Sequence, residues 1–106
     1  MEFKDIQANI IKNAERYSKD YGVTIDKEFC ALKLTEELGE FAEAALTHAR
    51  KSRPEKLLPE EESKKRLAHE LADVVGMALV TADVYGINLE EALKEKWMKK
   101  HSEDSE

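Results

Sequence analysis

The sequence predicts an all-α protein whose helices pack as a four-helix bundle. Only two prolines and four glycines interrupt the 106 residues, and apolar residues recur at helical spacing throughout the chain. No segment alternates with the period of a strand. A chain of this length forms one domain with a modest core, so residues 1–106 are assigned to a single helical domain.

The first helix is predicted over residues 3–21, where apolar side chains recur every three or four positions. Gly22 follows as a C-terminal cap, and the β-branched residues 23–25 form the connection. Asp26 is the expected N-cap of a second helix, which runs to about Lys51. Two of the four helices are therefore bounded by residues with known capping chemistry.

A loop is predicted over residues 52–58, before a third helix that has Pro59 in its first turn and ends at Tyr85. The apolar stripe of this helix is broad, which predicts burial on more than one side. Its members are Leu67, Leu71, Val74, Val75, Ala78, Leu79 and Ala82.

The last helix is short. Gly86 ends the third helix, and Asn88 begins a capping box that opens a fourth helix to about Lys100. The polar residues 101–106 are expected to fray.

Charge and composition exclude several classes of protein. A net charge of −6 argues against nucleic-acid binding, which needs a basic surface. The single cysteine, Cys30, lies on an apolar stripe and is expected to be a buried thiol. Residues 1–5 lack a signal-peptide profile, and the apolar run 71–84 is too short to span a membrane. We expect a soluble, cytoplasmic protein that binds no membrane.

An acidic pair in residues 34–43 organises the chain. Glu37 and Glu40 stand three residues apart, so a helix places both carboxylates on one face, beside apolar neighbours. Such a pair is costly unless a cation or a proton lies between the carboxylates. Gly39, in the same turn, costs about 1 kcal/mol relative to alanine. This glycine predicts the close approach of another helix or a ligand.

The third helix repeats the acidic spacing with Glu70 and Asp73. If the second and third helices form an antiparallel hairpin, four carboxylates converge: Glu37, Glu40, Glu70 and Asp73. Oxygen ligands suit Mg²⁺ or Mn²⁺ rather than zinc or copper. A di-iron bundle needs Glu-x-x-His, but the residues three before the histidines are Ala45, Arg66 and Met98. Because the chain has 23 acidic residues, a solvated acidic surface is the alternative.

The segments LKLTEELGE (residues 32–40) and ELADVV (residues 70–75) resemble the signature of the MazG-like all-α nucleoside triphosphate pyrophosphohydrolases. In that family an E-E-x-x-E motif and an E-x-x-D motif bind Mg²⁺. The segment ADVYGINLEEALKEK (residues 82–96) also resembles the family's last two helices. The long connection over residues 41–69 and the sequence at 99–102 depart from the smaller family members.

The resemblance implies Mg²⁺-dependent hydrolysis of a nucleoside triphosphate between its α- and β-phosphates, in the service of nucleotide-pool house-cleaning. It also implies a homodimer or homotetramer, and the broad apolar stripe agrees with this. Phosphoribosyl-ATP pyrophosphohydrolase is an alternative within the same class. A non-catalytic helical module, whose acidic faces bind basic partners, is the alternative from a different class.

Individual roles follow from spacing and from the resemblance. Glu37 is both a metal ligand and a candidate catalytic carboxylate, and Glu36 either activates water or faces solvent. Lys33 pairs with Glu37 or reaches phosphate, and by resemblance Lys96 contacts phosphate. Trp97 is a candidate to stack on the base, with a place in the core as the alternative. Further candidates are aromatic residues that stack on a base or belong to the core, Tyr17, Tyr21 and Phe41, and loop cations that cover phosphates or are solvated, Arg50, Lys51 and Arg53.

Overall fold

The structure is a computed structural model that describes residues 1–98. Over this range it contains helices α1 (Phe3–Tyr21), α2 (Lys27–His48), α3 (Glu60–Tyr85) and α4 (Leu89–Trp97), a short 3-10 turn η1 (Pro54–Lys56), and no strand. The prediction of an all-α protein with four helices is confirmed. None of the helices in this range combines the length and the apolar character needed to cross a membrane.

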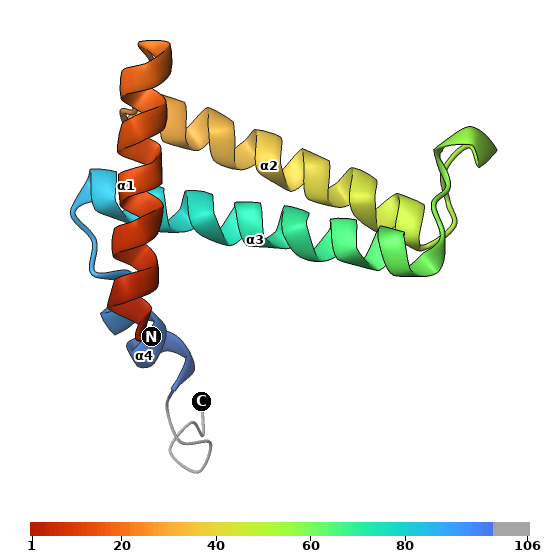
Figure 1. Cartoon of the computed structure of the whole chain (residues 1–106). Coiled ribbons are helices and arrows are strands. Elements are labelled where there is room, and N and C mark those ends of the chain that lie inside the picture. Colours follow the sequence, from red (N-terminus) through yellow and green to blue (C-terminus); the bar gives the residue numbers. More distant parts are fainter. Residues whose placement is uncertain (99–106) are drawn as a thin grey trace.

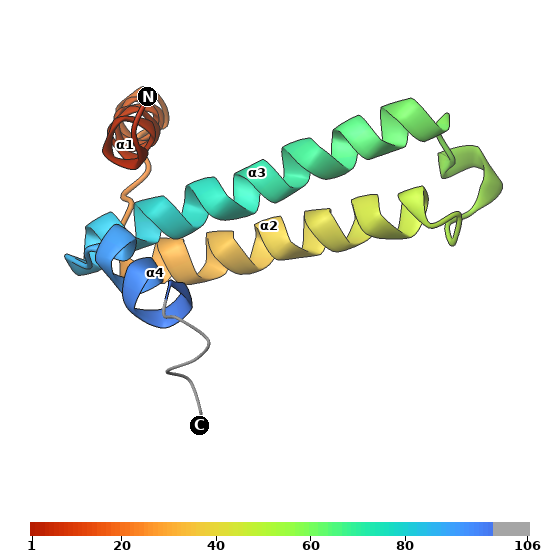
Figure 2. The same cartoon turned by 90° about the horizontal axis from the view of Figure 1, so that it is seen from below.

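The molecule is built on a long antiparallel hairpin of α2 and α3 (Figure 1). Helix α1 crosses one end of the hairpin, and α4 lies at the same end on the opposite side (Figure 2). The radius of gyration is 16.9 Å, whereas a compact chain of this length has a value of about 13 Å. The bundle is therefore open, and most of the hairpin is covered by neither α1 nor α4.

The predicted caps are confirmed. Gly22 and Gly86 end α1 and α3 with φ angles of 63° and 70°, the left-handed conformation that glycine adopts without strain. The Asp26 side chain accepts a hydrogen bond from the backbone N–H of Phe29 at 2.9 Å. Asn88 accepts one from Glu91 at 3.0 Å in the same way. Local chemistry thus fixes where the helices begin and end.

Two predicted boundaries are wrong. Helix α2 ends at His48 rather than near Lys51, because Arg50 has a φ of 61° and turns the chain out of the helix. Pro59 is the residue before the first turn of α3 rather than part of that turn. The predicted end of the last helix near Lys100 and the predicted fraying of residues 101–106 lie outside the described residues.

The buried core is small and lies mainly where α1 crosses the hairpin. Cys30 is fully buried and free, as predicted. On α3, Leu79 is 2% exposed, but Leu71 and Val75 are 50% and 53% exposed. The broad stripe of α3 is therefore covered on one side only within this chain. The remaining buried side chains are Ala44, Thr47, Ser63, Val80 and Ala82.

The hairpin has two chemically different sides. Glu37 and Glu70 meet between the helices, and the next residue on each helix, Leu38 or Leu71, is turned by about 100°. Because the helices are antiparallel, these two leucines lie on the same side, together with Val75, which we call the apolar side. Residues three positions after the glutamates are turned the opposite way and form the acidic side, which includes Asp73.

Helix α1 covers one end of the acidic side. Val80 stands seven residues after Asp73 and shares its face of α3. It lines a small apolar groove together with Ala14 and Tyr17 of α1. The carboxylates therefore lie on the same side of the hairpin as α1, beyond the stretch that α1 covers.

Candidate metal centre

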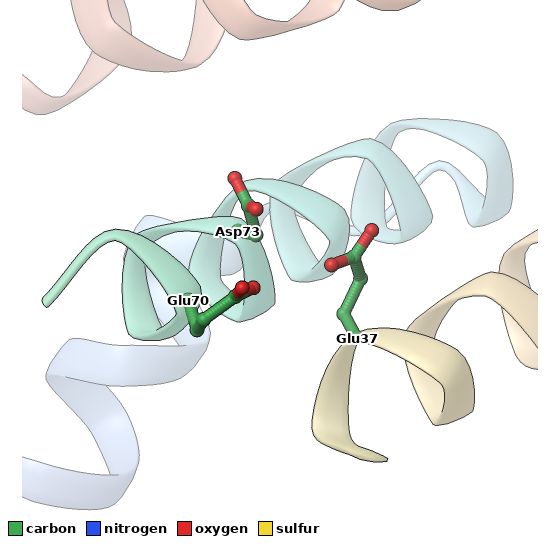
Figure 3. Close-up of side chains that lie close together, drawn as sticks. All are labelled: Glu37, Glu70 and Asp73. Atoms are coloured by element: carbon green, nitrogen blue, oxygen red, sulfur yellow. The ribbon is translucent and has the colours of Figure 1, made fainter. Parts of the chain in front are cut away.

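Three carboxylates converge in the middle of the hairpin. Glu37 comes from α2, and Glu70 and Asp73 come from successive turns of α3 (Figure 3). One oxygen of each lies within 4.8 Å of the others. We call this group the carboxylate triad. It forms because the three-residue spacing puts the α3 pair on one face, and antiparallel packing brings α2 opposite.

The structure brings together three of the four predicted metal ligands, and Glu40 is the one left out. Its side chain is exposed, one turn beyond Glu37 on α2. Its charge nevertheless acts on Glu37 and is among the causes of that residue's raised pKa. Glu40 therefore stands at the edge of the triad.

The triad is electrostatically uncompensated. Burial raises the pKa of the Glu37 carboxyl, and the charges of Glu40 and Asp73 raise it further, while Lys33 opposes them. The Oε1 atom of Glu37 and the Oε1 atom of Glu70 are both buried without a hydrogen-bond partner among the described residues. Buried oxygens of this kind are stabilised by a cation. The donor set, made only of carboxylate oxygens, fits a hard divalent cation.

The stability of the metal-free protein should depend on pH because of the carboxylate triad. The raised pKa of Glu37 means that the folded protein binds this proton more tightly than the unfolded chain. The free energy of unfolding should therefore fall as pH rises from the ordinary value of 4.5 through the raised pKa, and then level off. Glu37→Gln should remove this contribution. Urea unfolding of wild type and variant in EDTA at several pH values measures this contribution. A difference in unfolding free energy between the two proteins that does not change with pH would contradict the prediction.

Lys33 and Glu36 pair with each other. The Lys33 Nζ lies 2.8 Å from the Glu36 Oε1, so the predicted pairing of Lys33 with Glu37 is wrong as a direct contact. The hydrogen bond to Glu36 raises the pKa of Lys33. Glu36 is outside the triad, with 55% of its side chain exposed. Lys33 also borders a groove of about 380 Å³, together with Phe29.

The α4 candidates lie apart from the triad. Lys96 and Trp97 are both exposed, Trp97 by 76%. Tyr21 is 71% exposed at the end of α1. The core interpretation is therefore wrong for Trp97 and Tyr21 in a single chain. Tyr17 instead approaches Phe29, with their ring centroids 6.4 Å apart.

Gly39 has no close neighbour within the described part of the chain. A Cβ atom added to it would meet nothing within 4 Å, so the predicted approach of another helix is not found among residues 1–98, and the approach of a ligand stays a prediction. The glycine leaves an open surface next to Glu40.

One residue near the triad was missed by sequence reasoning. Arg66 of α3 lies 3.8 Å from the Glu43 carboxylate of α2 and bridges the two helices. It stands four residues before Glu70, so the helical spacing that identified Glu70 and Asp73 also places Arg66 beside them. That spacing is the signal from which it could have been found.

The helical hairpin with its facing carboxylates defines an all-α protein with a candidate cation site, and the comparison with known families assigns its class. The model of the family described as phosphoribosyl-ATP pyrophosphohydrolase matches residues 3–99, nearly the whole chain. The chain therefore belongs to this family, which is part of the MazG-like all-α nucleoside triphosphate pyrophosphohydrolase superfamily. The resemblance noted in the sequence is confirmed at this level. Members of the superfamily usually use divalent metals.

Among curated proteins, "Uncharacterized protein YvdC" of Bacillus subtilis (strain 168) is 40% identical over 63 residues. The match covers 58% of this chain and 59% of the relative, so the chain spans about three fifths of the relative's length. No solved structure gives a significant match.

Proposed function

We propose that the protein hydrolyses a nucleoside triphosphate between its α- and β-phosphates, releasing the monophosphate and pyrophosphate, with Mg²⁺ or Mn²⁺ as cofactor. The carboxylate triad carries this proposal, because two of its oxygens are buried without a hydrogen-bond partner in residues 1–98. The family assignment supports the reaction class. House-cleaning of the nucleotide pool is the proposed role.

The cation would be held by the triad, Glu37, Glu70 and Asp73, with Glu40 as a fourth ligand from the edge. When bound, it supplies charge neutralisation for the phosphates and a water of lowered pKa. The chain's net charge of −6 would otherwise repel a polyphosphate. Glu36, beside Glu37 in the sequence, is the proposed carboxylate that accepts the proton of the attacking water.

The nucleoside is proposed to bind toward α1. Lys33 and Phe29 border two grooves, of about 380 and 130 Å³, and the smaller one is also lined by Ala14 and Tyr17 of α1. An aromatic ring and a lysine suit a base and its phosphate. Lys96 and Trp97 lie on α4, on the other side of the hairpin from α1 (Figure 2). The contacts predicted for these two residues with phosphate and base therefore stay predictions.

Phosphoribosyl-ATP is the second candidate substrate, because the matched family carries that name. It presents the same α–β phosphate linkage to the triad and also releases pyrophosphate. The two candidates differ in the group beyond the phosphates and not in the chemistry of the metal centre.

The test is release of pyrophosphate from a panel of canonical and modified NTPs and dNTPs, and from phosphoribosyl-ATP, with Mg²⁺, with Mn²⁺ and with EDTA. We expect metal-dependent release of a nucleoside monophosphate and pyrophosphate, abolished by EDTA. Release from phosphoribosyl-ATP alone would select the second candidate. Folded protein that releases no pyrophosphate under any condition would overturn the enzymatic proposal in favour of a binding module.

We also propose that the active unit is a homo-oligomer, a dimer or a dimer of dimers. The chain exposes 8312 Å² of surface, whereas a folded monomer of this mass exposes about 6,000 Å². A standard interface removes about 800 Å² from each partner. On the apolar side, Leu38, Leu71 and Val75 are each about half exposed.

A second copy is the proposed occupant of the apolar side. This side is formed by two antiparallel helices, so a two-fold related copy presents the same surface and the four helices form a closed bundle.

A further inference from the structure

The closed end of the hairpin holds a basic groove in an otherwise acidic protein. The groove has a volume of about 570 Å³ and lies between the end of α2, the connection to α3 and the beginning of α3. Four cationic side chains border it, and Glu43 is the one carboxylate in its lining. The cations are Lys51, Arg53, Lys56 and Arg66.

The ion pairs in this groove are open to exchange. Arg66 lies 3.8 Å from Glu43, whose side chain is 67% exposed. Arg53 lies 3.2 Å from Glu55, and both side chains are exposed. Exposed pairs of this kind contribute about 0–1 kcal/mol. A phosphate group, which accepts charge-assisted hydrogen bonds from several donors at once, competes well with them.

The connection that carries these cations is held in place. Arg50, with its left-handed backbone, donates a hydrogen bond to the Leu58 carbonyl oxygen across the loop. Thr47 is 3% exposed, and its hydroxyl lies 3.2 Å from that of Ser52; both residues line the groove. The groove is therefore a shaped surface with hydroxyl groups in its floor.

The groove begins about one helical turn from the carboxylate triad. Arg66 is four residues before Glu70, one turn or about 6 Å along α3. It is also seven residues before Asp73, which places it on the acidic side of the hairpin. The groove and the triad thus follow each other along one side of the hairpin, with α1 at the far end.

We propose that this groove binds the pyrophosphate part of the substrate, the β- and γ-phosphates that leave together. The inference rests on the proposed function and adds the direction of the substrate: the nucleoside lies toward α1, the scissile linkage at the triad, and the terminal phosphates at the closed end of the hairpin. The groove would favour triphosphates over diphosphates, because the γ-phosphate is the group that extends farthest from the triad toward Arg66.

The experiment is binding of inorganic pyrophosphate, in the presence of Mg²⁺, to the full-length protein by isothermal titration calorimetry. The double variant Lys51→Gln/Arg66→Gln should weaken pyrophosphate binding at least tenfold, since it removes two charged donors from the groove. The matched control, Lys64→Gln/Lys65→Gln, makes the same change in net charge on exposed residues of α3. It should weaken binding less than threefold. Circular dichroism checks that both variants are folded.

A kinetic readout accompanies the binding measurement. The groove variant should lose most of its preference for a nucleoside triphosphate over the corresponding diphosphate, through a higher KM for the triphosphate. Equal weakening by both double variants would show a general charge effect and overturn the proposal, as would unchanged pyrophosphate binding. If the wild type hydrolyses triphosphates and the groove variant binds pyrophosphate as the wild type does, the groove proposal is rejected and the proposed function stands. A wild type that hydrolyses nothing would instead reject the proposed function.

Discussion

Glu37→Gln is expected to lower kcat/KM for the best substrate of the panel by a thousandfold or more. Glu37 supplies the α2 carboxylate of the triad, and glutamine in its place removes the negative charge and leaves the cation only a neutral oxygen from α2. A thousandfold loss corresponds to about 4 kcal/mol of transition-state stabilisation. A correctly placed divalent cation contributes several kcal/mol to phosphoryl chemistry. Steady-state pyrophosphate release at saturating Mg²⁺ measures the loss.

The same variant separates a catalytic defect from a folding defect. The raised pKa of Glu37 shows that its charge is unfavourable, because the carboxylate is partly buried and is repelled by Glu40 and Asp73. Glutamine at this position removes that charge. The metal-free variant should therefore be more stable than wild type near neutral pH while it loses activity. Asp20→Asn, which changes an exposed carboxylate at the end of α1, is the control and should leave both quantities unchanged. Full activity in Glu37→Gln would show that the metal site is wrongly assigned.

Val75→Lys is expected to dissociate the proposed oligomer into monomers. Val75 lies on the apolar side of α3 and is 53% exposed in the single chain. In the proposed assembly a lysine there would be a buried charge without a partner, which strongly destabilises an interface. Light scattering coupled to size-exclusion chromatography measures the mass, and the melting temperature should fall together with it.

The control for this variant is Ile6→Lys on α1. Ile6 is 44% exposed, similar to Val75, but α1 lies on the acidic side of the hairpin. It should leave the mass unchanged. A wild-type protein that is monomeric at all concentrations would contradict the proposal of a second copy, and so would a Val75→Lys variant that keeps the wild-type mass.

The fold was largely predictable because its boundaries depend on local chemistry. Each cap residue acts on helix ends only a few positions away, either by accepting a hydrogen bond from a free backbone N–H or by ending the helix. Such local contacts can be predicted from the sequence, as they were at Gly22, Asp26, Gly86 and Asn88. Arg50 is the exception. Its positive φ ends α2 early, and nothing in the local sequence distinguishes it from a residue that continues the helix.

The candidate site was predictable as a face of a helix but not as a set of distances. Three-residue spacing identified Glu37, Glu70 and Asp73, which do converge. The same spacing included Glu40, whose carboxylate lies outside the triad, although Asp73, which is exposed as well, belongs to it. Likewise, Glu36 and Glu37 stand three and four residues after Lys33, and both are within its reach. Lys33 pairs with Glu36 because Glu37 faces α3. Only the packing of two helices decides such questions.

The uneven core of the hairpin has a consequence for its local opening. The apolar buried side chains Cys30, Leu79 and Val80 gather near α1, while at the closed end the buried residues include the polar Thr47 and Ser63. Segments with few buried apolar contacts open at low free energy, so backbone amides near the closed end should exchange with solvent before those near α1. A ligand that bridges the triad and the closed end would then slow that exchange. Its affinity would include the free energy spent on ordering this end of the hairpin.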